Sequence, residues 1–226
     1  MTPYYDSDEI TLFNGDCLDV LPLLSNISTV IADPPYTFGL ASTQNGKLGS
    51  WADLMNNATW YSLWLGECFR LTESQQGAAW IFNSWRSFPV LGRAATLADW
   101  SIESLLVWDK EWIGPGGHRG LRPSYEMIAL FAHDTFSLPN RGLPDIWRSK
   151  WSATKPNGHP AEKPLALCER IIKESGLDGV VLDPFAGSGT SLVAAKNLGH
   201  TAIGIEWEEK YCEVAAKRLS QGILKV

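Results

Sequence analysis

The sequence predicts an α/β fold in which helices cover both faces of a mostly parallel sheet. Apolar runs and amphipathic segments alternate along the whole chain, as expected of strands and helices that follow one another. The runs are continuously apolar, which is typical of strands buried on both faces. With 226 residues, 45% of them hydrophobic, the chain is long enough to bury one substantial core, so we predict a single domain over residues 1–226.

Each predicted strand is a short apolar run, and each predicted helix is a longer segment between two such runs. The predicted strands, in chain order, are 30–32, 78–82, 104–108, 127–131, 180–182 and 202–205. The predicted helices are 60–71, 87–98, 164–174, 190–198 and 207–220. The last helix carries an apolar packing stripe at helical spacing, formed by Tyr211, Val214, Ala215 and Leu219.

The cysteines and the N-terminal residues indicate a reducing compartment. The four cysteines lie far apart in sequence and form no Cys-x-x-Cys pair, so we expect buried thiols and neither disulfides nor a metal site. The chain has no run of the roughly 20 apolar residues that a membrane span requires. Residues 1–9 are polar and acidic, unlike a signal peptide. We therefore expect a soluble, cytoplasmic protein without a membrane partner.

Charge is distributed unevenly along the chain. The net charge of −6 argues against a protein that coats DNA. Residues 112–160, however, hold six basic and three acidic residues, a local balance of +3. We predict a small basic recognition insert at 112–158 that touches nucleic acid, with an ordinary solvated loop as the alternative. A second segment, 37–58, is rich in Gly, Ser and Asn and predicts a flexible loop.

A glycine-rich turn near the end of the chain predicts a cofactor site. The turn follows the strand that ends at Asp183 and precedes the helix that begins near Thr190. Gly187 and Gly189 allow a sharp turn and a close approach by a ligand. Ligands of open α/β sheets bind at the carboxyl ends of strands. Glu206 ends the next strand, 23 positions after Asp183, near the offset at which an acidic residue captures a ribose.

The residues around the turn favour one cofactor class. A phosphate-binding P-loop requires Lys after its second glycine, where this chain has Thr190. The dinucleotide pattern Gly-x-Gly-x-x-Gly is incomplete because Leu192 occupies its last position. The Asp183 carboxylate suits the ammonium of a methionine moiety and would repel a pyrophosphate. S-adenosylmethionine therefore fits better than NAD, and a structural strand–turn–helix without a ligand is the plainer alternative.

The segment Asp33-Pro34-Pro35-Tyr36 predicts the catalytic group. It follows a buried strand, so its carboxylate is expected at the same sheet edge as Asp183. A carboxylate and the Pro34 carbonyl, both accepting hydrogen bonds from an amino group, would localise the nitrogen lone pair; Pro35 stiffens the turn. Tyr36 offers a face on which an extruded base stacks. The alternative is a proline-stiffened turn with a capping Asp and a core Tyr.

These segments, in this order, resemble the DNA amino-methyltransferases that act on adenine N6 or cytosine N4, in the permuted group whose catalytic motif precedes its cofactor motif. The resemblance covers nearly the whole chain. It includes the early Asn14-Gly15-Asp16-Cys17 motif and later motifs that begin at Trp108, Arg122, His159, Leu182 and Gly204. The resemblance implies a Rossmann-like methyltransferase fold, S-adenosylmethionine as cofactor and methylation of DNA, often within restriction–modification systems.

The resemblance also implies roles for individual residues. The cofactor pocket would be lined by Asp33, Asp183, Pro184, Phe185, Gly187, Ser188, Gly189 and Thr190. Glu206 would hold the ribose hydroxyls, Trp207 would pack on the adenine ring, and Asp16 and Cys17 would border that ring. His159, Lys163 and Pro164 would flank the methionine end. For Lys163, a pair with the cofactor carboxylate and a structural place before a helix are both open.

Asp in the first catalytic position goes mostly with adenine in this family, so we predict adenine N6 as the target and keep cytosine N4 as the alternative. The expected partner is double-stranded DNA, contacted by Arg119, Arg122, Arg141, Arg148 and Lys150. Permuted relatives often dimerise, so a homodimer is possible. Other readings are an RNA or protein N-methyltransferase, an NAD-dependent dehydrogenase and a catalytically idle DNA-binding module.

Overall fold

The computed structural model describes residues 1–7, 9–35, 58–114, 120–152 and 162–221. Nine strands form one sheet: β1 (Tyr5–Asp6), β2 (Ile10–Asn14), β3 (Ile27–Ala32), β4 (Ala78–Asn83), β5 (Ser101–Asp109), β6 (Tyr125–Ala132), β7 (Ile146–Arg148), β8 (Val180–Asp183) and β9 (Ala202–Glu206). The helices are α1 (Cys17–Val20), η1 (Leu21–Leu23), α3 (Ala58–Glu73), α4 (Phe88–Leu97), α5 (Leu165–Ser175), α6 (Thr190–Asn197) and α7 (Glu209–Leu219). All predicted strands and helices are confirmed.

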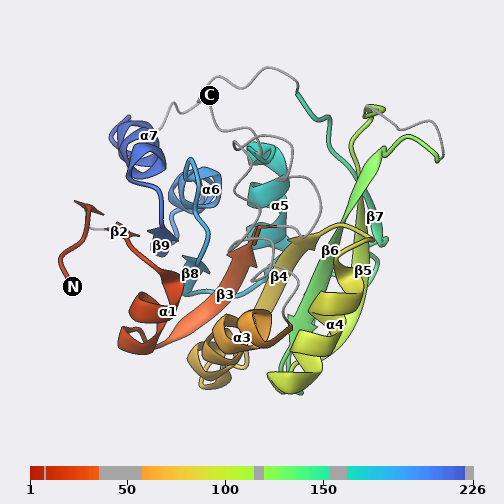
Figure 1. Ribbon diagram of the computed structural model, residues 1–226, viewed down its shortest axis with the longest axis horizontal. Helices are drawn as coiled ribbons and strands as arrows, with labels where there is room; N and C mark the ends of the chain where they lie inside the picture. Colours follow the sequence, from red (N-terminus) through yellow and green to blue (C-terminus); the bar gives the residue numbers. More distant parts are fainter. Residues whose placement is uncertain (8, 36–57, 115–119, 153–161, 222–226) are drawn as a thin grey trace, which may run out of the picture.

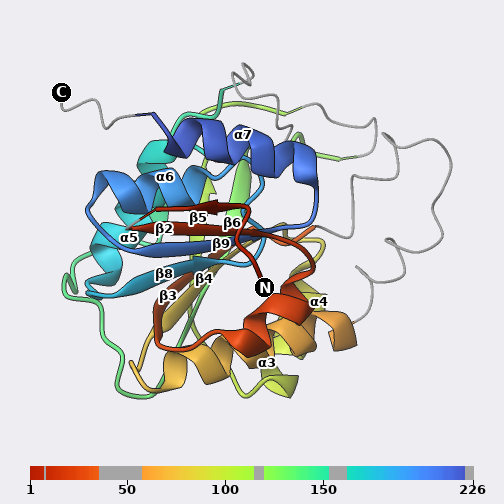
Figure 2. The same ribbon diagram turned by 90° about the vertical axis from the view of Figure 1, so that its left-hand side faces the viewer.

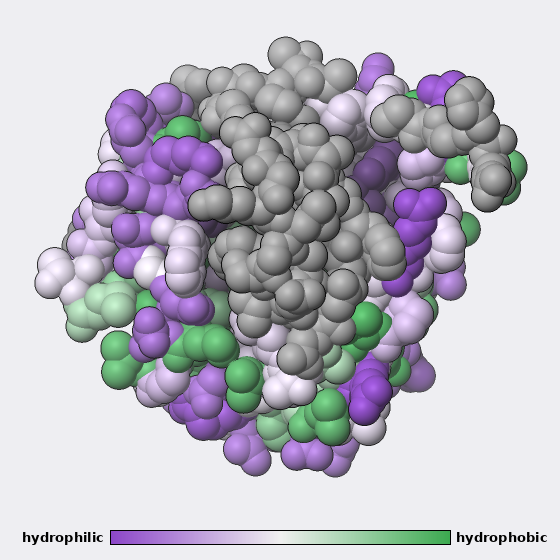
Figure 3. Space-filling model, in the orientation of Figure 1, coloured by the Kyte–Doolittle hydropathy of each residue, from purple (hydrophilic) through white to green (hydrophobic). Residues whose placement is uncertain are grey.

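The sheet lies between two layers of helices. Helices α5, α6 and α7 cover one face, and α1, α3 and α4 cover the other (Figures 1 and 2). The buried apolar side chains accordingly form two clusters, one under each helix layer. Hydrophilic residues gather over the outer side of α7 (Figure 3), whose exposed positions include Glu213 and Lys217. The predicted three-layer α/β architecture is therefore confirmed.

The strand order is β1-β2-β9-β8-β3-β4-β6-β5-β7. The neighbours β2–β9, β9–β8, β8–β3, β3–β4 and β5–β7 are parallel, whereas β1–β2, β4–β6 and β6–β5 are antiparallel. The sheet is mostly parallel, as predicted. β6 is antiparallel to its neighbours β4 and β5. The first residues of β6 therefore lie on the same side of the sheet as the C-terminal ends of β3, β4, β5, β7 and β8. This side, where these strands end, is called the carboxyl edge below.

The segment 112–158 enters the sheet more deeply than an insert would. Its β6 lies between β4 and β5 and is buried from Ile128 to Ala132, so this stretch belongs to the core. His133 is also buried, and its Nε2 forms a hydrogen bond of 3.0 Å with Thr72 Oγ1. Burial lowers the pKa of His133, so this histidine adds no positive surface charge. In the described part of 112–158, the exposed basic residues lie in the loops before and after β6 and at the end of β7; they are Arg122, Arg141, Arg148 and Lys150.

Sequence patterns did not predict β1, β2, α1, η1 or β7. These elements are two to five residues long, too short for periodicity to distinguish them from loops. The pairing of β2 with β9 places Asn14 opposite Glu206, so the chain's first long strand borders its last one. Gly204 allows α6 to pack closely on β9, because a Cβ at this position would lie 2.5 Å from Leu192 Cδ1 on α6.

Candidate active site

The two acidic strand ends meet in one pocket. β3 and β8 are parallel neighbours, with Val30 opposite Leu182, so Asp33 and Asp183 reach the carboxyl edge side by side. Both line a pocket with an empty volume of about 390 Å³, counting its open mouth. The structure thus places the Asp33 turn and the glycine-rich turn next to each other, as predicted.

Asp183 is buried and is held by neutral donors. Its Oδ1 accepts the Phe185 amide hydrogen at 2.9 Å, and its Oδ2 accepts the Ser191 hydroxyl hydrogen. Burial raises the pKa of Asp183 to about 7, although these two hydrogen bonds act in the opposite direction. The carboxylate is therefore poised to ionise near neutral pH, and a cation in the pocket would favour its charged form.

The glycine turn is held open by a second carboxylate. Gly187 and Gly189 have φ of 52° and 77°, which favour glycine. Glu206 Oε2 accepts the Gly187 amide hydrogen at 2.8 Å, and its Oε1 accepts the Glu208 amide hydrogen at 2.8 Å. Burial raises the pKa of Glu206. Each oxygen accepts one backbone N–H, which leaves lone pairs on both oxygens for a ligand diol.

Arg218 on α7 braces the other side of this turn, a contact that the sequence analysis missed. Its Nη1 donates to the Ser188 carbonyl at 2.6 Å and lies 3.1 Å from both the Ser188 and Thr190 hydroxyls. Glu162 Oε1 is 3.5 Å from the same nitrogen. Arg218 lies on the same face of α7 as the apolar stripe, seven residues after Tyr211, and the stripe was interpreted as packing alone.

Strand β2 brings the early Asp motif to the glycine turn. Asn14 Nδ2 donates to the carbonyls of Glu206 and Trp207 at 2.9 and 3.0 Å. Asp16 begins α1 as its N-cap, accepting the Leu18 amide hydrogen at 2.9 Å, and Cys17 is buried. Trp207 is 57% exposed. The residues predicted to surround the cofactor's adenosine thus lie around the ends of β2 and β9.

The catalytic turn is packed against helix α3. Pro34 is buried, and the Pro35 carbonyl accepts a hydrogen bond from the Tyr61 hydroxyl at 2.8 Å. Burial raises the pKa of Tyr61, so its hydroxyl remains a donor. The Trp64 ring meets the Phe185 ring edge-on, with centroids 5.1 Å apart. Helix α3 therefore supports both the catalytic and the glycine-rich turn, and Tyr61 is a further residue that sequence reasoning missed.

Lys163 pairs with the predicted catalytic carboxylate. Its Nζ donates to Asp33 Oδ2 at 2.5 Å and lies 3.4 Å from Glu126 Oε2. Burial acts to lower the pKa of Lys163, but Asp33 and Glu126 together raise it above its ordinary value. In this structure the ammonium is thus engaged by protein carboxylates, a partner that neither of the two expectations for Lys163 included.

Several predicted site residues lie outside the described residues. These are Tyr36, Arg119, His159 and positions 37–57 of the predicted flexible loop. Pro164 is the N-cap of α5, directly after Lys163, and Pro184 is buried in the turn after β8. The four cysteines are buried free thiols, as expected. Within the described part of the chain, no group of three or more His, Cys, Asp or Glu could hold a metal ion.

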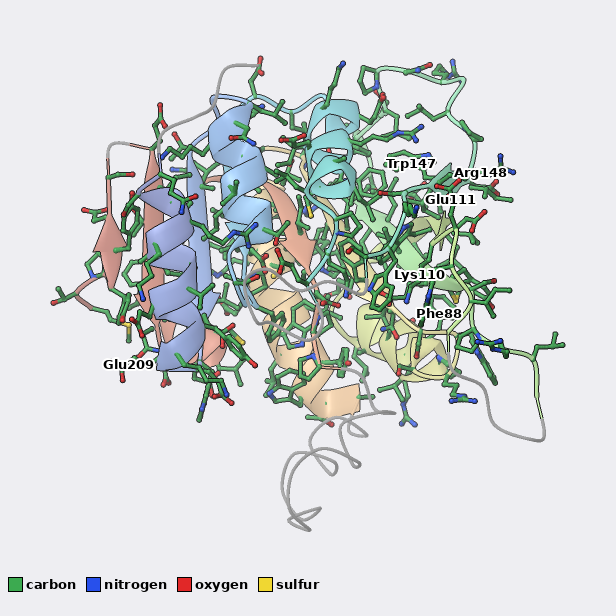
Figure 4. All side chains as sticks on the ribbon, turned by 90° about the horizontal axis from the view of Figure 1, so that it is seen from above. Phe88, Lys110, Glu111, Trp147, Arg148 and Glu209 are labelled. Carbon is green, nitrogen blue, oxygen red and sulfur yellow. The ribbon has the colours of Figure 1, made fainter. Side chains whose placement is uncertain are left out.

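The predicted DNA-contact residues divide between two sheet edges. Arg148 is the last residue of β7 and Lys150 lies two positions after it, and both are exposed at the carboxyl edge; Figure 4 shows Arg148 on the same flank as Lys110, opposite Glu209. Arg122 lies at this edge as well, but its guanidinium donates to the Gly114 and Ile113 carbonyls at 2.8 and 3.2 Å.

Arg141 is not brought to the site. It lies in the loop from β6 to β7, which starts at the opposite edge because β6 ends there. Neighbouring Pro139 lies against Gly176, at the C-terminal end of α5, in agreement with this placement. The structure therefore does not support a role for Arg141 in binding DNA at the Asp33–Asp183 pocket.

An exposed pair of an aromatic ring and a guanidinium, which the sequence analysis missed, follows β4 at the carboxyl edge. Trp85 is 58% exposed, and the Arg86 guanidinium lies 5.1 Å from the centre of its ring. β4 pairs with β3, so this pair stands two residues beyond the strand end nearest to Asp33 and Pro34. Its signal in the sequence was weak, because Trp85 is one of 11 tryptophans, and five of those that the structure describes are buried in the core.

Comparison with known proteins places these features in a family. Residues 27–217 match the N6/N4 methyltransferase family model, described as DNA methylase. The chain is 31% identical to the type II methyltransferase M.HinfI of Haemophilus influenzae, covering 93% of this chain and 68% of that protein. It is 28% identical to the DNA adenine methyltransferase YhdJ of Escherichia coli, covering 95% of this chain and 84% of that protein.

A solved structure agrees with the fold. The crystal structure of the M1.HpyAVI–SAM complex superposes with a TM-score of 0.71 at 24% identity, covering 92% of this chain and 99% of that one. This likeness confirms the predicted Rossmann-like fold. The family match spans both the catalytic and the glycine-rich motifs and confirms the resemblance drawn from them. The chain belongs to the N6/N4 DNA methylase family.

Proposed function

We propose that this DNA methylase transfers a methyl group from S-adenosylmethionine to the exocyclic N6 of adenine in duplex DNA. The observation that carries the proposal is the shared pocket of Asp33 and Asp183 at the ends of two parallel strands. One carboxylate stands at the turn expected to hold the base, and the other stands at the turn expected to hold the cofactor. No helix in the described residues is long and apolar enough to cross a membrane.

The residues of the glycine turn fit S-adenosylmethionine. The buried Asp183 carboxylate accepts hydrogen bonds from two neutral donors, the Phe185 amide and the Ser191 hydroxyl, and so suits an ammonium group. Glu206 presents its two oxygens where a ribose diol is expected, and the exposed Trp207 ring suits a flat purine. When bound, S-adenosylmethionine supplies an electrophilic methyl group on a sulfonium. Because the Lys163 ammonium already contacts Asp33 and Glu126, we do not assign it to the cofactor carboxylate.

The catalytic turn fits an amino group as acceptor. Asp33 engages Lys163 through Oδ2, so Oδ1 is the oxygen proposed to accept one amino hydrogen. The Pro34 carbonyl is proposed to accept the other. Together these acceptors localise the nitrogen lone pair toward the methyl donor. Asp33 need not remove a proton first, because the nitrogen becomes strongly acidic only after it has gained the methyl group.

Adenine is favoured over cytosine by two observations. The catalytic motif begins with Asp33, the residue that goes mostly with adenine in this family. A relative aligned over 95% of this chain is named a DNA adenine methyltransferase. Cytosine N4 is the second candidate because the family includes both activities.

Duplex DNA would approach the carboxyl edge. Arg148 and Lys150 supply exposed positive charge there, and Trp85 with Arg86 supplies an exposed aromatic and cationic pair beside the Asp33 turn. Such a pair is suited to stack on a base or to fill the gap left by an extruded one. A second subunit would enlarge this small contact surface, which agrees with the expected homodimer.

Two measurements test the proposal. Duplex DNA is incubated with the protein and tritiated S-adenosylmethionine, then digested to nucleosides that mass spectrometry identifies. We expect N6-methyl-2′-deoxyadenosine; N4-methyl-2′-deoxycytidine would establish the second candidate. Absence of label on any DNA, with cofactor binding intact, would exclude the proposed function. Sequencing DNA from cells that express the protein, with detection of modified bases, gives the recognition sequence.

A further inference from the structure

Four side chains of alternating charge form a chain that ends at Asp33. Lys163 Nζ lies 2.5 Å from Asp33 Oδ2 and 3.4 Å from Glu126 Oε2. Glu126 uses its other oxygen, Oε1, to accept a hydrogen bond from Lys110 Nζ at 2.5 Å. The order is therefore carboxylate, ammonium, carboxylate, ammonium, and each inner group touches both of its neighbours.

The chain of charges is held away from water. The four side chains are between 10% and 22% exposed, with Lys163 the most buried. The Lys163 ammonium lies 5.1 Å from the centre of the Phe82 ring, and the Lys110 ammonium lies 5.2 Å from the Trp108 ring. At such burial, removing one partner leaves a costly unpaired charge, so the four groups constrain one another.

The four residues come from four separate segments. Asp33 follows β3, Glu126 is in β6, Lys110 follows β5, and Lys163 precedes α5. β4 separates β3 from β6 in the sheet, so Lys163 spans the end of β4 to reach both carboxylates.

We propose that Lys163 and Glu126 are positioning residues for methyl transfer. Lys163 fixes the Asp33 carboxylate by occupying Oδ2, so that Oδ1 faces the target amino group. Glu126 holds the Lys163 ammonium in the place where it reaches Oδ2, and Lys110 holds Glu126 in turn. This inference deepens the proposed function and rests on it, because it gives the catalytic carboxylate a defined orientation.

The principal test is Glu126→Gln, which removes a charge but keeps the shape and one acceptor. We expect kcat to fall about 10- to 100-fold, as small misplacements of a catalytic group do. The dissociation constant for S-adenosylmethionine, measured by calorimetry, should stay within about twofold. Glu213→Gln is the matched control, because it neutralises a similar pair with Lys217 that is exposed on α7. Its kcat should equal that of the wild type.

Variants of the two lysines locate the effect. Lys163→Arg, which can still bridge two carboxylates, should retain more kcat than Lys163→Met. As a single substitution, Lys110→Met should lower kcat. Added to Glu126→Gln it should cause no further loss, because Lys110 acts through Glu126. Thermal unfolding identifies any variant that fails to fold, and the conclusions then rest on Glu126→Gln and Lys163→Arg.

Three outcomes decide the inference. A wild-type kcat in folded Glu126→Gln overturns it. A higher dissociation constant for S-adenosylmethionine in Lys163→Arg, with kcat unchanged at saturation, also overturns it and assigns Lys163 to the cofactor. A wild-type protein that methylates no DNA refutes the proposed function itself, which is a different result because both variants are judged relative to an active wild type.

Discussion

The carboxylates at the ends of β3 and β8 are neighbours with opposite electrostatic surroundings. Asp33 is paired with the ammonium of Lys163, a cation that the protein itself supplies. Asp183 accepts hydrogen bonds from an amide and a hydroxyl, and burial raises its pKa to about 7. One carboxylate is already neutralised, whereas the other gains most from a cation that arrives with a ligand. Charge thus distinguishes the catalytic side from the cofactor side.

The largest effect is expected from removing the catalytic carboxylate. Asp33→Ala should lower kcat for DNA methylation by at least about 1000-fold, because the amino group loses its charged acceptor. Binding of S-adenosylmethionine, measured by calorimetry, should remain within a few fold of wild type. Asp33→Asn serves as a second variant that leaves Lys163 a hydrogen-bond acceptor. Full turnover in either folded variant would remove the assigned role of Asp33.

The converse substitution sharpens the comparison on the cofactor side. Asp183→Asn should raise the dissociation constant for S-adenosylmethionine about 10- to 100-fold, the value of a charged hydrogen bond in a buried site. At saturating cofactor its kcat should stay near the wild-type value. Equal losses of kcat in Asp33→Asn and Asp183→Asn would show that the two carboxylates do not have separate roles.

The raised pKa of Asp183 predicts a pH dependence. The folded protein keeps this proton up to about pH 7, whereas the unfolded chain loses it near pH 4, so the ligand-free protein loses stability as pH rises through that interval. A cationic ligand favours the ionised carboxylate. Between pH 6 and 7.5, below the range where the ligand's own amino group deprotonates, the dissociation constant should fall about 5- to 10-fold.

Calorimetry at several pH values checks this dependence, with Asp183→Asn as its control. The variant should show a flatter profile, and at pH 8 its melting temperature without ligand should exceed that of the wild type. A profile of equal slope in the variant would mean that another group carries the titration.

The smallest effect concerns the support of the Asp33 turn by α3. Tyr61→Phe deletes the hydroxyl that donates to the Pro35 carbonyl, which should cost about 1 kcal/mol of unfolding free energy. We expect kcat to fall about three- to tenfold while cofactor binding is unchanged. Tyr5→Phe on the edge strand β1 is the control. A change in cofactor affinity for Tyr61→Phe alone would show that α3 couples the two turns.

Patterns local in sequence predicted the architecture and the position of both acidic turns. An apolar run followed by Asp33 or Asp183 is enough to place each carboxylate at the carboxyl edge, because parallel strands end together. The Lys163–Asp33 pair was not predictable in this way, since 130 positions separate its members. Tyr61 was hidden among Trp60 and Trp64 on a helix whose aromatic residues all resemble core.

The predicted basic insert shows where local composition is a poor guide. Its basic residues lie close together in sequence, but the direction of β6 decides which of its loops reach the carboxyl edge. That direction separates Arg148 at the carboxyl edge from Arg141 at the other. Composition carries no information on strand direction, and so the two arginines were grouped together.

The pairing of β2 with β9 has a consequence for how such enzymes vary. It places the first long strand of the chain beside the last one, and Tyr4 near α7. Because β2 joins the sheet through β9 and not through β3, which follows it in sequence, the neighbours of each strand do not depend on the order of the segments along the chain. The order of the two acidic turns along the chain can therefore differ between proteins of this fold, provided that the folded sheet brings both turns to the carboxyl edge.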